Sequence, residues 1–290
     1  MLAFDIHFFT HRHYYSGAGV ETAMQVSEWI QRTVERLRAK GATDVLLACE
    51  GHGSFRRELT DEAGWTDNKY KDRPPKPDDL RHQIKLVREL LEGLGFCCVS
   101  VDRYEADDVM ASAAAQFPGK TTIITADKDL RQCLSDSTNM LLDVSWSEDE
   151  ESGEMSPEYK WLSTKMLWEM TGGEYDKNDK GEFVKTADGE LIPTPGTGIR
   201  PDQWADFQAI MGDNVDGIQG AAGVGQKGST NLIQEFGTVE ASIQAAKDES
   251  ESIKPKQREA LIEFESRLEI TRQLVTLRTD LDIPLNLTRI

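Results

Sequence analysis

Short apolar runs alternate with helical stretches over the first 150 residues, and this alternation constrains the fold more than any other feature. Runs typical of buried strands cover residues 2–6, 45–49, 96–101, 121–125 and 140–144. Apolar residues recur at helical spacing over residues 21–40, 78–94 and 105–117. Strands that alternate with helices form a parallel sheet covered on both faces. The pattern therefore predicts an α/β fold with a twisted, mainly parallel sheet flanked by helices.

Carboxylates follow these runs where a strand ends or a helix begins. In open sheets of this type, functional sites lie beyond the carboxyl ends of the strands. Carboxylates gathered there repel one another unless a cation holds them, and hard divalent cations prefer oxygen ligands. We expect a site for two Mg²⁺ ions, with Mn²⁺ as a substitute, a pair that acts as a clamp in phosphodiester hydrolysis. The nine acids are Asp5, Glu50, Glu105, Asp107, Asp108, Asp127, Asp129, Asp213 and Asp216.

Each acidic motif also has a plainer interpretation when it is taken alone. Glu105, Asp107 and Asp108 would complement the dipole at the start of a helix. Asp127 and Asp129, two residues apart after a strand, fit a helix cap as well as a phosphatase-like metal site. Only the agreement of several motifs distinguishes a metal site from these roles at helix starts.

A glycine-rich helix start follows the last two acids. Gly223 and Gly225 precede Lys227 in the sequence GAAGVGQK. The free amides of such a helix start can hold a phosphate, and the lysine adds a positive charge. The motif is short, but its place directly after two acids strengthens the prediction of a phosphate-binding turn.

Charge and composition narrow the class of protein. The net charge of −18 argues at first sight against nucleic acid, but residues 54–90 carry nine Lys or Arg against eight Asp or Glu. Hydrophobic residues make up 38% of the chain, and no apolar run approaches the roughly 20 residues that span a bilayer. The N-terminus lacks the pattern of a signal peptide, and the four cysteines form no CxxC pair. We therefore expect a cytoplasmic protein with free thiols and no membrane segment.

The organisation changes after about residue 150. Helices are predicted at 161–170, 201–211, 223–236, 239–246 and 256–277. Residues 54–76 show no clean period and predict a long surface excursion. Residues 172–198 form an insert rich in Gly, Pro, Asp and Lys, in which Asp188-Gly189 is typical of a hairpin turn. We expect a core at 1–150 and a helical region at 151–290.

Six blocks, in this order, resemble the flap endonuclease family. They are Asp5, Phe55-Arg56, KYKDRPPKPDDLRHQI from Lys69, YEADDV from Tyr104, TADKDL from Thr125 and MGDNVDGIQGAAGVGQK from Met211. The strongest likeness is to the 5′-nuclease domain of bacterial DNA polymerase I and to standalone bacteriophage 5′-exonucleases, over nearly the whole chain. The resemblance implies a PIN-like core with an arch or gateway at about 54–90. It also implies a helix-three-turn-helix motif at about 205–237 that grips duplex DNA.

The resemblance implies a role for each group of polar residues. The nine acids correspond to the family's metal-site acids. Basic residues of the arch and of the first block would act near the scissile phosphate: Lys69 or Lys71, with Arg73, and Arg12. The predicted DNA contacts are Arg56, Lys76, Gly223, Gly225 and Lys227. The resemblance also implies a monomeric protein with a K⁺ ion at the helix-three-turn-helix. The implied partner is DNA with 5′ ends, flaps or nicks, or an RNA–DNA hybrid.

The chain departs from the family pattern at three places. Glu50 stands where an Asp is usual, which moves that carboxylate outward. Lys71 is one residue from Arg73, where two are usual, so sequence does not decide between Lys69 and Lys71 as the arch lysine. The usual Asn-Ile-Pro-Gly after the last acids is residues 217–220, Gly-Ile-Gln-Gly.

Several functions are compatible with these motifs. The first is a structure-specific 5′-3′ exonuclease and 5′-flap endonuclease that works in replication or repair with two metal ions. The alternatives are a DNA-structure-binding protein with weakened catalysis, a related metal-dependent ribonuclease and a phosphatase. A pure binder would gain nothing from so much carboxylate repulsion, and a phosphatase would not need the helix-three-turn-helix block. We therefore favour the nuclease.

Overall fold

The structure is a computed structural model and describes residues 1–65, 69–72, 74–148, 155–284 and 287–289. The chain divides into two units. The first unit comprises Met1–Phe55, Arg73–Ser163 and Leu277–Ile290, and the second comprises Arg56–Asp72 and Thr164–Thr276. The division near residue 150 that the sequence suggests stays a prediction.

The first unit is built on one mainly parallel sheet. Its strands follow the order β3-β2-β1-β4-β5-β6, and β7 pairs with β2. The pairs from β3 to β5 are parallel, whereas β6 and β7 run antiparallel to their neighbours. The strands are β1 Leu2–Asp5, β2 Asp44–Ala48, β3 Cys98–Val99, β4 Thr121–Ile124, β5 Thr138–Glu148, β6 Met155–Leu162 and β7 Thr288–Arg289. The predicted α/β class with a mainly parallel sheet is confirmed.

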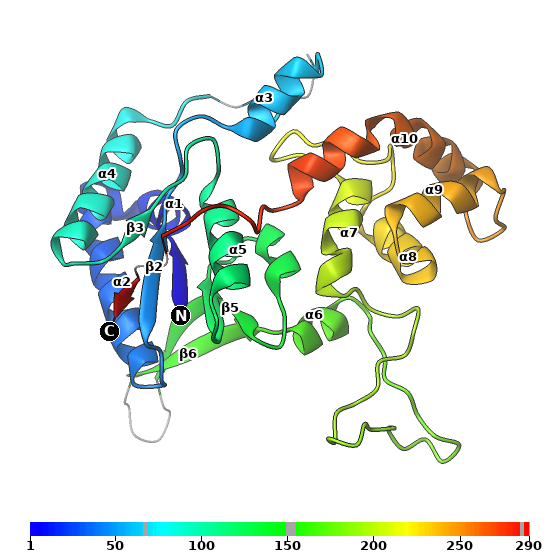
Figure 1. Cartoon of the computed structure of the whole chain (residues 1–290), viewed down its shortest axis with the longest axis horizontal. Coiled ribbons are helices and arrows are strands. Elements are labelled where there is room, and N and C mark those ends of the chain that lie inside the picture. The colour runs from blue at the N-terminus through cyan, green and yellow to red at the C-terminus, as the bar shows by residue number, and fades with distance from the viewer. Residues whose placement is uncertain (66–68, 73, 149–154, 285–286, 290) are drawn as a thin grey trace. The chain divides into compact units, whose positions relative to one another are not determined.

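Helices cover both faces of this sheet (Figure 1). Apolar residues of β1 and β2 pack with α2 and α4 in one cluster that includes Phe4, Leu47, Ile30 and Val87, all fully buried. Helix α5 contacts β1, β2 and β4. The helices of this unit are α1 Ile6–His13, α2 Thr22–Arg38, α4 Asp78–Gly93 and α5 Ala106–Gln116.

The second unit is helical. Its helices are α3 Phe55–Glu62, whose first residue belongs to the first unit, α6 Thr164–Met170, α7 Trp204–Met211, α8 Gln226–Phe236, α9 Val239–Lys247 and α10 Pro255–Val275. Helix α7 contacts α8, α9 and α10 around buried residues such as Trp204, Ile210 and Ile233. The C-terminal helical region of the predicted fold class is therefore confirmed, whereas its bounds of 151–290 stay a prediction, and β6 lies within them. Within the described ranges, no helix has both the length and the apolar character needed to cross a bilayer.

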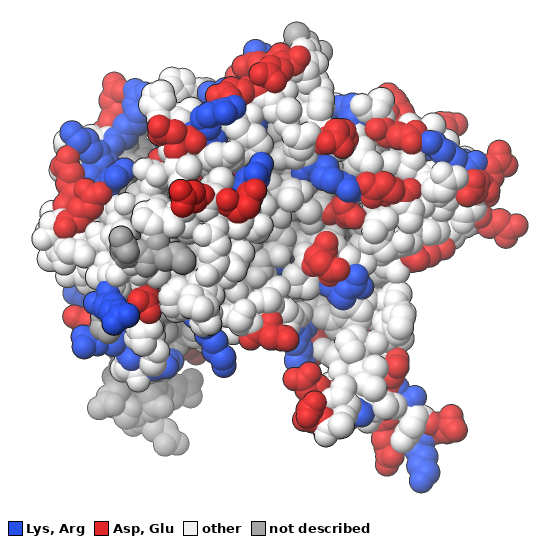
Figure 2. All heavy atoms as spheres, in the orientation of Figure 1, with Lys and Arg blue, Asp and Glu red and all other residues white. Residues whose placement is uncertain are grey.

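The insert at 172–198 forms a long excursion (Figure 1) that carries side chains of both charges (Figure 2), and it contains two successive short hairpins, the first of which is bridged between Lys177 and Phe183. Antiparallel bridges join Tyr175 to Pro193 and Lys185 to Leu191. The amide of Gly189 donates to the carbonyl of Thr186 at 3.0 Å, and its φ of +86° suits glycine. The predicted turn at Asp188-Gly189 is therefore present.

Several elements differ from the sequence prediction. The segment 161–170 begins as strand, because Trp161 and Leu162 pair with β5, and the helix starts only at Thr164. Helices α1 and α3 fall in segments for which no helix was predicted. Strand β7 forms next to β2 through pairing that no local pattern indicates, with Thr288 opposite Val45.

Candidate metal centre and nucleic-acid interface

Strand register brings three predicted acids of the first unit to one edge of the sheet. Asp5, the last residue of β1, pairs with Ala48 at the end of β2, and Phe4 pairs with Ile124 at the end of β4. Glu50 and Asp127 follow two and three residues after those strand ends. Because parallel strands end at the same edge, the three carboxylates lie near one another.

Asp5 shows the electrostatic strain of this edge. Burial raises the pKa of Asp5 to about 7, and the charges of Glu50 and Asp127 add to the rise. Its Oδ1 accepts a hydrogen bond from the amide of Phe8 at 2.9 Å, which caps α1 and partly opposes the rise in pKa. A carboxylate in such surroundings is better stabilised by a cation than by water.

His7 is a neighbour of this edge that the sequence analysis did not single out. Its Nδ1 accepts a hydrogen bond from the amide of Glu50 at 3.3 Å. Burial, with nearby positive charges, lowers the pKa of His7 to about 3, so the ring is neutral at physiological pH. A neutral ring suits an acceptor and fixes the backbone that carries Glu50. The sequence signal that could have pointed to His7 is its position, two residues after Asp5.

The second pair of acids follows β4. Oδ1 of Asp127 accepts a hydrogen bond from the amide of Asp129 at 3.0 Å, and Asp129 opens a short 3-10 helix, η3 Asp129–Cys133. Arg131 of that helix lies near both carboxylates: burial lowers its pKa, and the two acids oppose the fall. The sequence analysis missed Arg131, although it follows the ADKDL block directly.

The acids at the start of α5 differ in burial: Glu105 and Asp108 are buried, and Asp107 is half-buried. Asp108 is fully buried; its Oδ2 accepts from the amide of Glu105 at 3.2 Å and its Oδ1 from the amide of Arg278 at 2.9 Å. Burial raises the pKa of Cys133, and the charges of Asp107 and Asp108 add to the rise, so these acids face η3. Asp108 therefore supports the backbone, and its role as a metal ligand stays a prediction.

The chemistry of this edge fits a divalent cation, because its donors are carboxylate oxygens and the charges of Glu50 and Asp127 contribute to the raised pKa of Asp5. Among the described residues, no three acidic, histidine or cysteine side chains are grouped as ligands of one ion. Asp5, Asp127 and Asp213 instead accept hydrogen bonds from backbone amides of their own turns.

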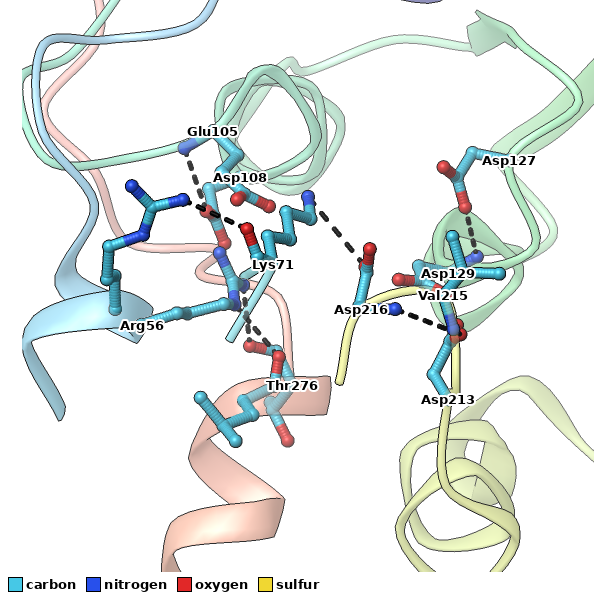
Figure 3. A network of polar contacts seen from close by, with 12 residues as sticks. Arg56, Lys71, Glu105, Asp108, Asp127, Asp129, Asp213, Val215, Asp216 and Thr276 are labelled. Atoms are coloured by element: carbon cyan, nitrogen blue, oxygen red, sulfur yellow. Dashed lines mark hydrogen bonds and ion pairs between the residues drawn. The ribbon is translucent and has the colours of Figure 1, made fainter. Parts of the chain in front are cut away.

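The second unit carries Asp213 and Asp216 on the loop after α7. Asp213 exchanges two backbone hydrogen bonds of 2.7 Å with Ile218, and its Oδ1 accepts from the amide of Val215 at 2.8 Å. Lys71 reaches toward this loop (Figure 3), with its Nζ 3.8 Å from Oδ2 of Asp216. The structure thus brings one candidate arch lysine to one pair of predicted acids.

The other predicted basic residues occupy varied surroundings. Lys69 forms an exposed ion pair of 2.7 Å with Asp61. Arg12 forms one of 2.9 Å with Asp143 of β5. Lys76 is exposed, and Arg73 lies outside the described residues.

The structure corrects the prediction that Arg56 contacts DNA. The sequence predicts it at the DNA-binding surface, but only 1% of the residue is exposed. Its guanidinium donates to the carbonyl of Leu274 at 2.9 Å and to that of Thr276 at 3.2 Å. A buried cation needs such partners, and here they satisfy the end of α10, so Arg56 has a structural role.

The glycine-rich turn forms the start of α8. Gly223 has a φ of +72°, and a Cβ at Gly223 or Gly225 would meet no atom within 4 Å, so the backbone is open to a ligand. Lys227 is exposed in the first turn of the helix. A hollow of about 440 Å³ lies here, and its wall also includes Lys254 at the start of α10. Two lysines beside free helix amides can bind a phosphate.

Two family descriptions match most of the chain. Residues 1–162 match "5'-3' exonuclease, N-terminal resolvase-like domain", and residues 199–290 match "5'-3' exonuclease, C-terminal SAM fold". The hairpin insert lies between the two matches.

Relatives of known sequence agree with these matches. The chain is 32% identical over 220 residues to "DNA polymerase I, thermostable" of Thermus aquaticus, which covers 75% of this chain and 21% of that protein. It is 29% identical over 210 residues to "5'-3' exonuclease" of Streptomyces coelicolor, which covers 72% of this chain and 58% of that protein. The chain therefore spans less than two thirds of the length of either relative.

Solved structures share the fold. One described as "Divalent metal ions (zinc) bound to T5 5'-exonuclease" aligns with a TM-score of 0.64 at 21% identity, over 96% of this chain and 90% of that chain. Another, "The catalytic core of Rad2 in complex with DNA substrate", aligns with a TM-score of 0.52 at 15% identity, over 97% of this chain and 78% of that chain. At these identities the likeness shows the fold alone.

Proposed function

Because the chain belongs to the 5′-3′ exonuclease family, we propose that it hydrolyses DNA phosphodiester bonds at 5′ ends, nicks and 5′ flaps. One structural observation carries the proposal. Asp5, Glu50 and Asp127 crowd at the carboxyl ends of β1, β2 and β4, and burial together with their mutual repulsion raises the pKa of Asp5 to about 7. Such crowding is unfavourable unless it serves to bind a cation.

We propose that these carboxylates hold two Mg²⁺ ions, for which Mn²⁺ can substitute. The structure of T5 5'-exonuclease described above has divalent metal ions bound, which supports the choice of cofactor class. When bound, the ions supply an activated water and stabilise the charge of the leaving oxygen. Asp107 and Asp129 are proposed as further ligands in the first unit. The proposal also includes Glu105, Asp108, Asp213 and Asp216 as metal-site acids, on the basis of the sequence motifs alone.

The chain's own cations would handle the substrate. Lys71, with Arg73 and Arg12, is proposed to contact the phosphate at which cleavage occurs and to offset its growing charge. The start of α8, with Gly223, Gly225 and Lys227, is proposed to hold the duplex backbone. We also propose that a K⁺ ion binds to carbonyls of the same turn and that Lys76, which is exposed, contacts the DNA.

The Rad2 core described above binds a DNA substrate, which supports DNA as the partner. We propose that the enzyme works as a monomer in the cytoplasm, in replication or repair, where it removes flaps or RNA primers. Hydrolysis needs no covalent intermediate and would leave 5′-phosphate and 3′-hydroxyl ends.

One observation favours a second candidate, a DNA-structure-binding protein with weakened catalysis. Glu50 replaces the usual Asp, and among the described residues no three candidate side chains are grouped for one ion. Such a protein would bind flaps without cutting them.

A cleavage assay separates the candidates. Labelled 5′-flap, nicked duplex, blunt duplex, single-stranded DNA and RNA are incubated with the protein in Mg²⁺, and again with EDTA. The nuclease releases short products from the flap and the nick only with metal. Intact flap substrate that remains bound after a long incubation in Mn²⁺ would support the binder. Faster cleavage of RNA than of DNA would support the ribonuclease.

A further inference from the structure

Two departures from the family pattern described above concern the loop after Asp216 and the lysine segment that lies against it. Gly217 stands where Asn is usual, and the spacing between Lys71 and the following Arg-Pro-Pro is one residue short. A Cβ built on Gly217 would lie 2.6 Å from the carbonyl oxygen of Lys69 and 3.9 Å from the amide nitrogen of Lys71. The first distance is shorter than a carbon and an oxygen tolerate, so a side chain at 217 would displace the lysine segment.

The backbone of Lys71 is held on both sides. Its amide donates to the carbonyl of Asp216 at 2.9 Å, and its carbonyl accepts from the guanidinium of Arg57 at 3.1 Å. Its φ of +48° is uncommon for a lysine, so these contacts maintain a conformation that the residue would not choose alone. The result places Nζ of Lys71 3.8 Å from Oδ2 of Asp216, with 23% of the side chain exposed.

The side chain of Lys69 differs from that of Lys71 in its partner and its exposure. Its Nζ pairs with Asp61 on α3 at 2.7 Å, and 43% of its side chain is exposed. This pair joins Lys69 to α3, whereas the pair of Lys71 joins it to Asp216 on the loop after α7. An exposed pair of this kind contributes little free energy and orients its lysine toward α3.

A further departure on the same loop reaches the same segment. Gln219 stands where Pro is usual, and its Oε1 accepts a hydrogen bond from Arg267 of α10. The guanidinium of Arg267 lies 4.8 Å from the ring centre of Trp65, a cation–π contact. Tyr70, next to Lys71, is buried, and its amide donates to the hydroxyl of Thr60 at 3.3 Å. The loop at 213–219 therefore contacts residues 69–71 directly, and it is linked to Trp65 through Arg267.

We propose that Gly217 is a positioning residue: it lets residues 69–71 seat against the loop that carries Asp213 and Asp216. The seating selects Lys71, rather than Lys69, as the lysine that acts on the phosphate. This inference rests on the proposed function for its catalytic part, whereas the seating itself is a property of the second unit alone.

Amide exchange tests the seating without any cleavage. In the wild-type protein, hydrogen exchange measured by mass spectrometry in peptides covering residues 70–72 is slow, because the Lys71 amide is bonded to Asp216. Gly217→Asn speeds this exchange at least about tenfold. Gly181→Asn is the matched control, since Gly181 has a similar φ of +78° and no atom within 4 Å of its Cβ position. Equal protection in wild type and Gly217→Asn overturns the proposal.

Kinetics test the choice of lysine. Lys71→Ala lowers kcat about 100-fold or more, and Lys69→Ala lowers it less than about threefold. Gly217→Asn lowers kcat with KM and duplex affinity within about twofold, and combined with Lys71→Ala it causes no further loss. A larger loss for Lys69→Ala, or full additivity in the double variant, overturns the inference. A wild-type chain that cleaves nothing overturns the proposed function and the catalytic role of Lys71, whereas amide exchange decides the seating by itself.

Discussion

The acids of the first unit and the lysines of the second are positioned by different means. Asp5, Glu50 and Asp127 follow parallel strands, so the register of the sheet fixes where each carboxylate emerges. Lys71 is placed by loop-to-loop contacts with Asp216 and Arg57, with a left-handed backbone of its own. A regular ladder tolerates change at its neighbours, whereas a loop contact depends on single residues. We therefore expect the position of the proposed metal site to tolerate substitutions around it, and the position of Lys71 to change with single substitutions in its contacts.

The largest expected effect concerns the acid edge, which is the edge of the sheet where Asp5, Glu50 and Asp127 follow β1, β2 and β4. Asp127→Ala should lower cleavage of a 5′ flap about 10³-fold or more, because it removes oxygen ligands of the proposed metal site. Duplex affinity, measured by fluorescence anisotropy in Ca²⁺, should change less than about threefold. Asp188→Ala, on the exposed hairpin turn, is the control and should keep full activity. Retained cleavage in Asp127→Ala would break the comparison, because the acid edge would then not be the reaction centre.

A second prediction concerns pH and the metal-free protein. An unfolded Asp loses its proton near pH 3.8, whereas folded Asp5 holds it to about pH 7. The folded state therefore binds more protons in this window, so the free energy of unfolding falls as pH rises from about 4 to 7 and levels off above. The full fall is on the order of 4 kcal/mol for this one group.

Asp5→Asn should remove that fall, because an amide does not titrate in this window and still caps α1 by accepting from Phe8. Urea unfolding in EDTA at pH 5 and pH 8 measures it. The variant should be more stable than wild type at pH 8, and the difference should shrink toward pH 5. The same pH dependence in both proteins would contradict the electrostatic account of this edge.

A third and smaller effect concerns the phosphate-binding turn. Lys227→Ala should weaken duplex binding about three- to tenfold for every sequence and reduce the slope of log affinity against log salt by about 1. Lys247→Ala is the matched control, because its ammonium is paired with Glu265 at 2.6 Å. If the salt slope is unchanged in Lys227→Ala, the hollow at α8 does not hold a phosphate.

The smallest effect is expected at the hairpin insert. Phe183 is 52% exposed, and its ring contacts the ring of Tyr175 and the ammonium of Lys177 within the same insert. Phe183→Ala should therefore change cleavage less than about twofold and the free energy of unfolding by less than about 0.5 kcal/mol. A tenfold loss of cleavage would instead give the hairpin a part in substrate handling.

The same contrast explains what could be predicted from sequence. Strands β1, β2 and β4 were predicted to within one residue at each end, because each is a short apolar or β-branched run with an acid at its end or within two residues after it. The acids of the edge followed from those strand ends. Glu50, two residues beyond β2, could be placed in the same way.

Contacts between distant residues could not be predicted. Arg56 was misplaced because the carbonyls that it binds lie 218 and 220 residues away in sequence. Lys69 and Lys71 could not be separated, since their difference arises from the loop at Asp216-Gly217. Residues 161–162 resemble a helix start locally, yet pairing with β5 makes them a strand. In each case a tertiary contact overrides the local pattern.

Direct binding of Mn²⁺, followed by electron paramagnetic resonance, tests the central claim that strand-end carboxylates hold divalent ions. The wild-type chain should bind two ions at saturation, with affinity that rises as pH increases toward 7 because protons compete for Asp5. The Asp5→Asn and Asp127→Ala variants should each lose at least one ion, whereas Asp188→Ala should bind as wild type does. Failure of the wild-type chain to bind Mn²⁺, or equal binding in all four proteins, would contradict the account.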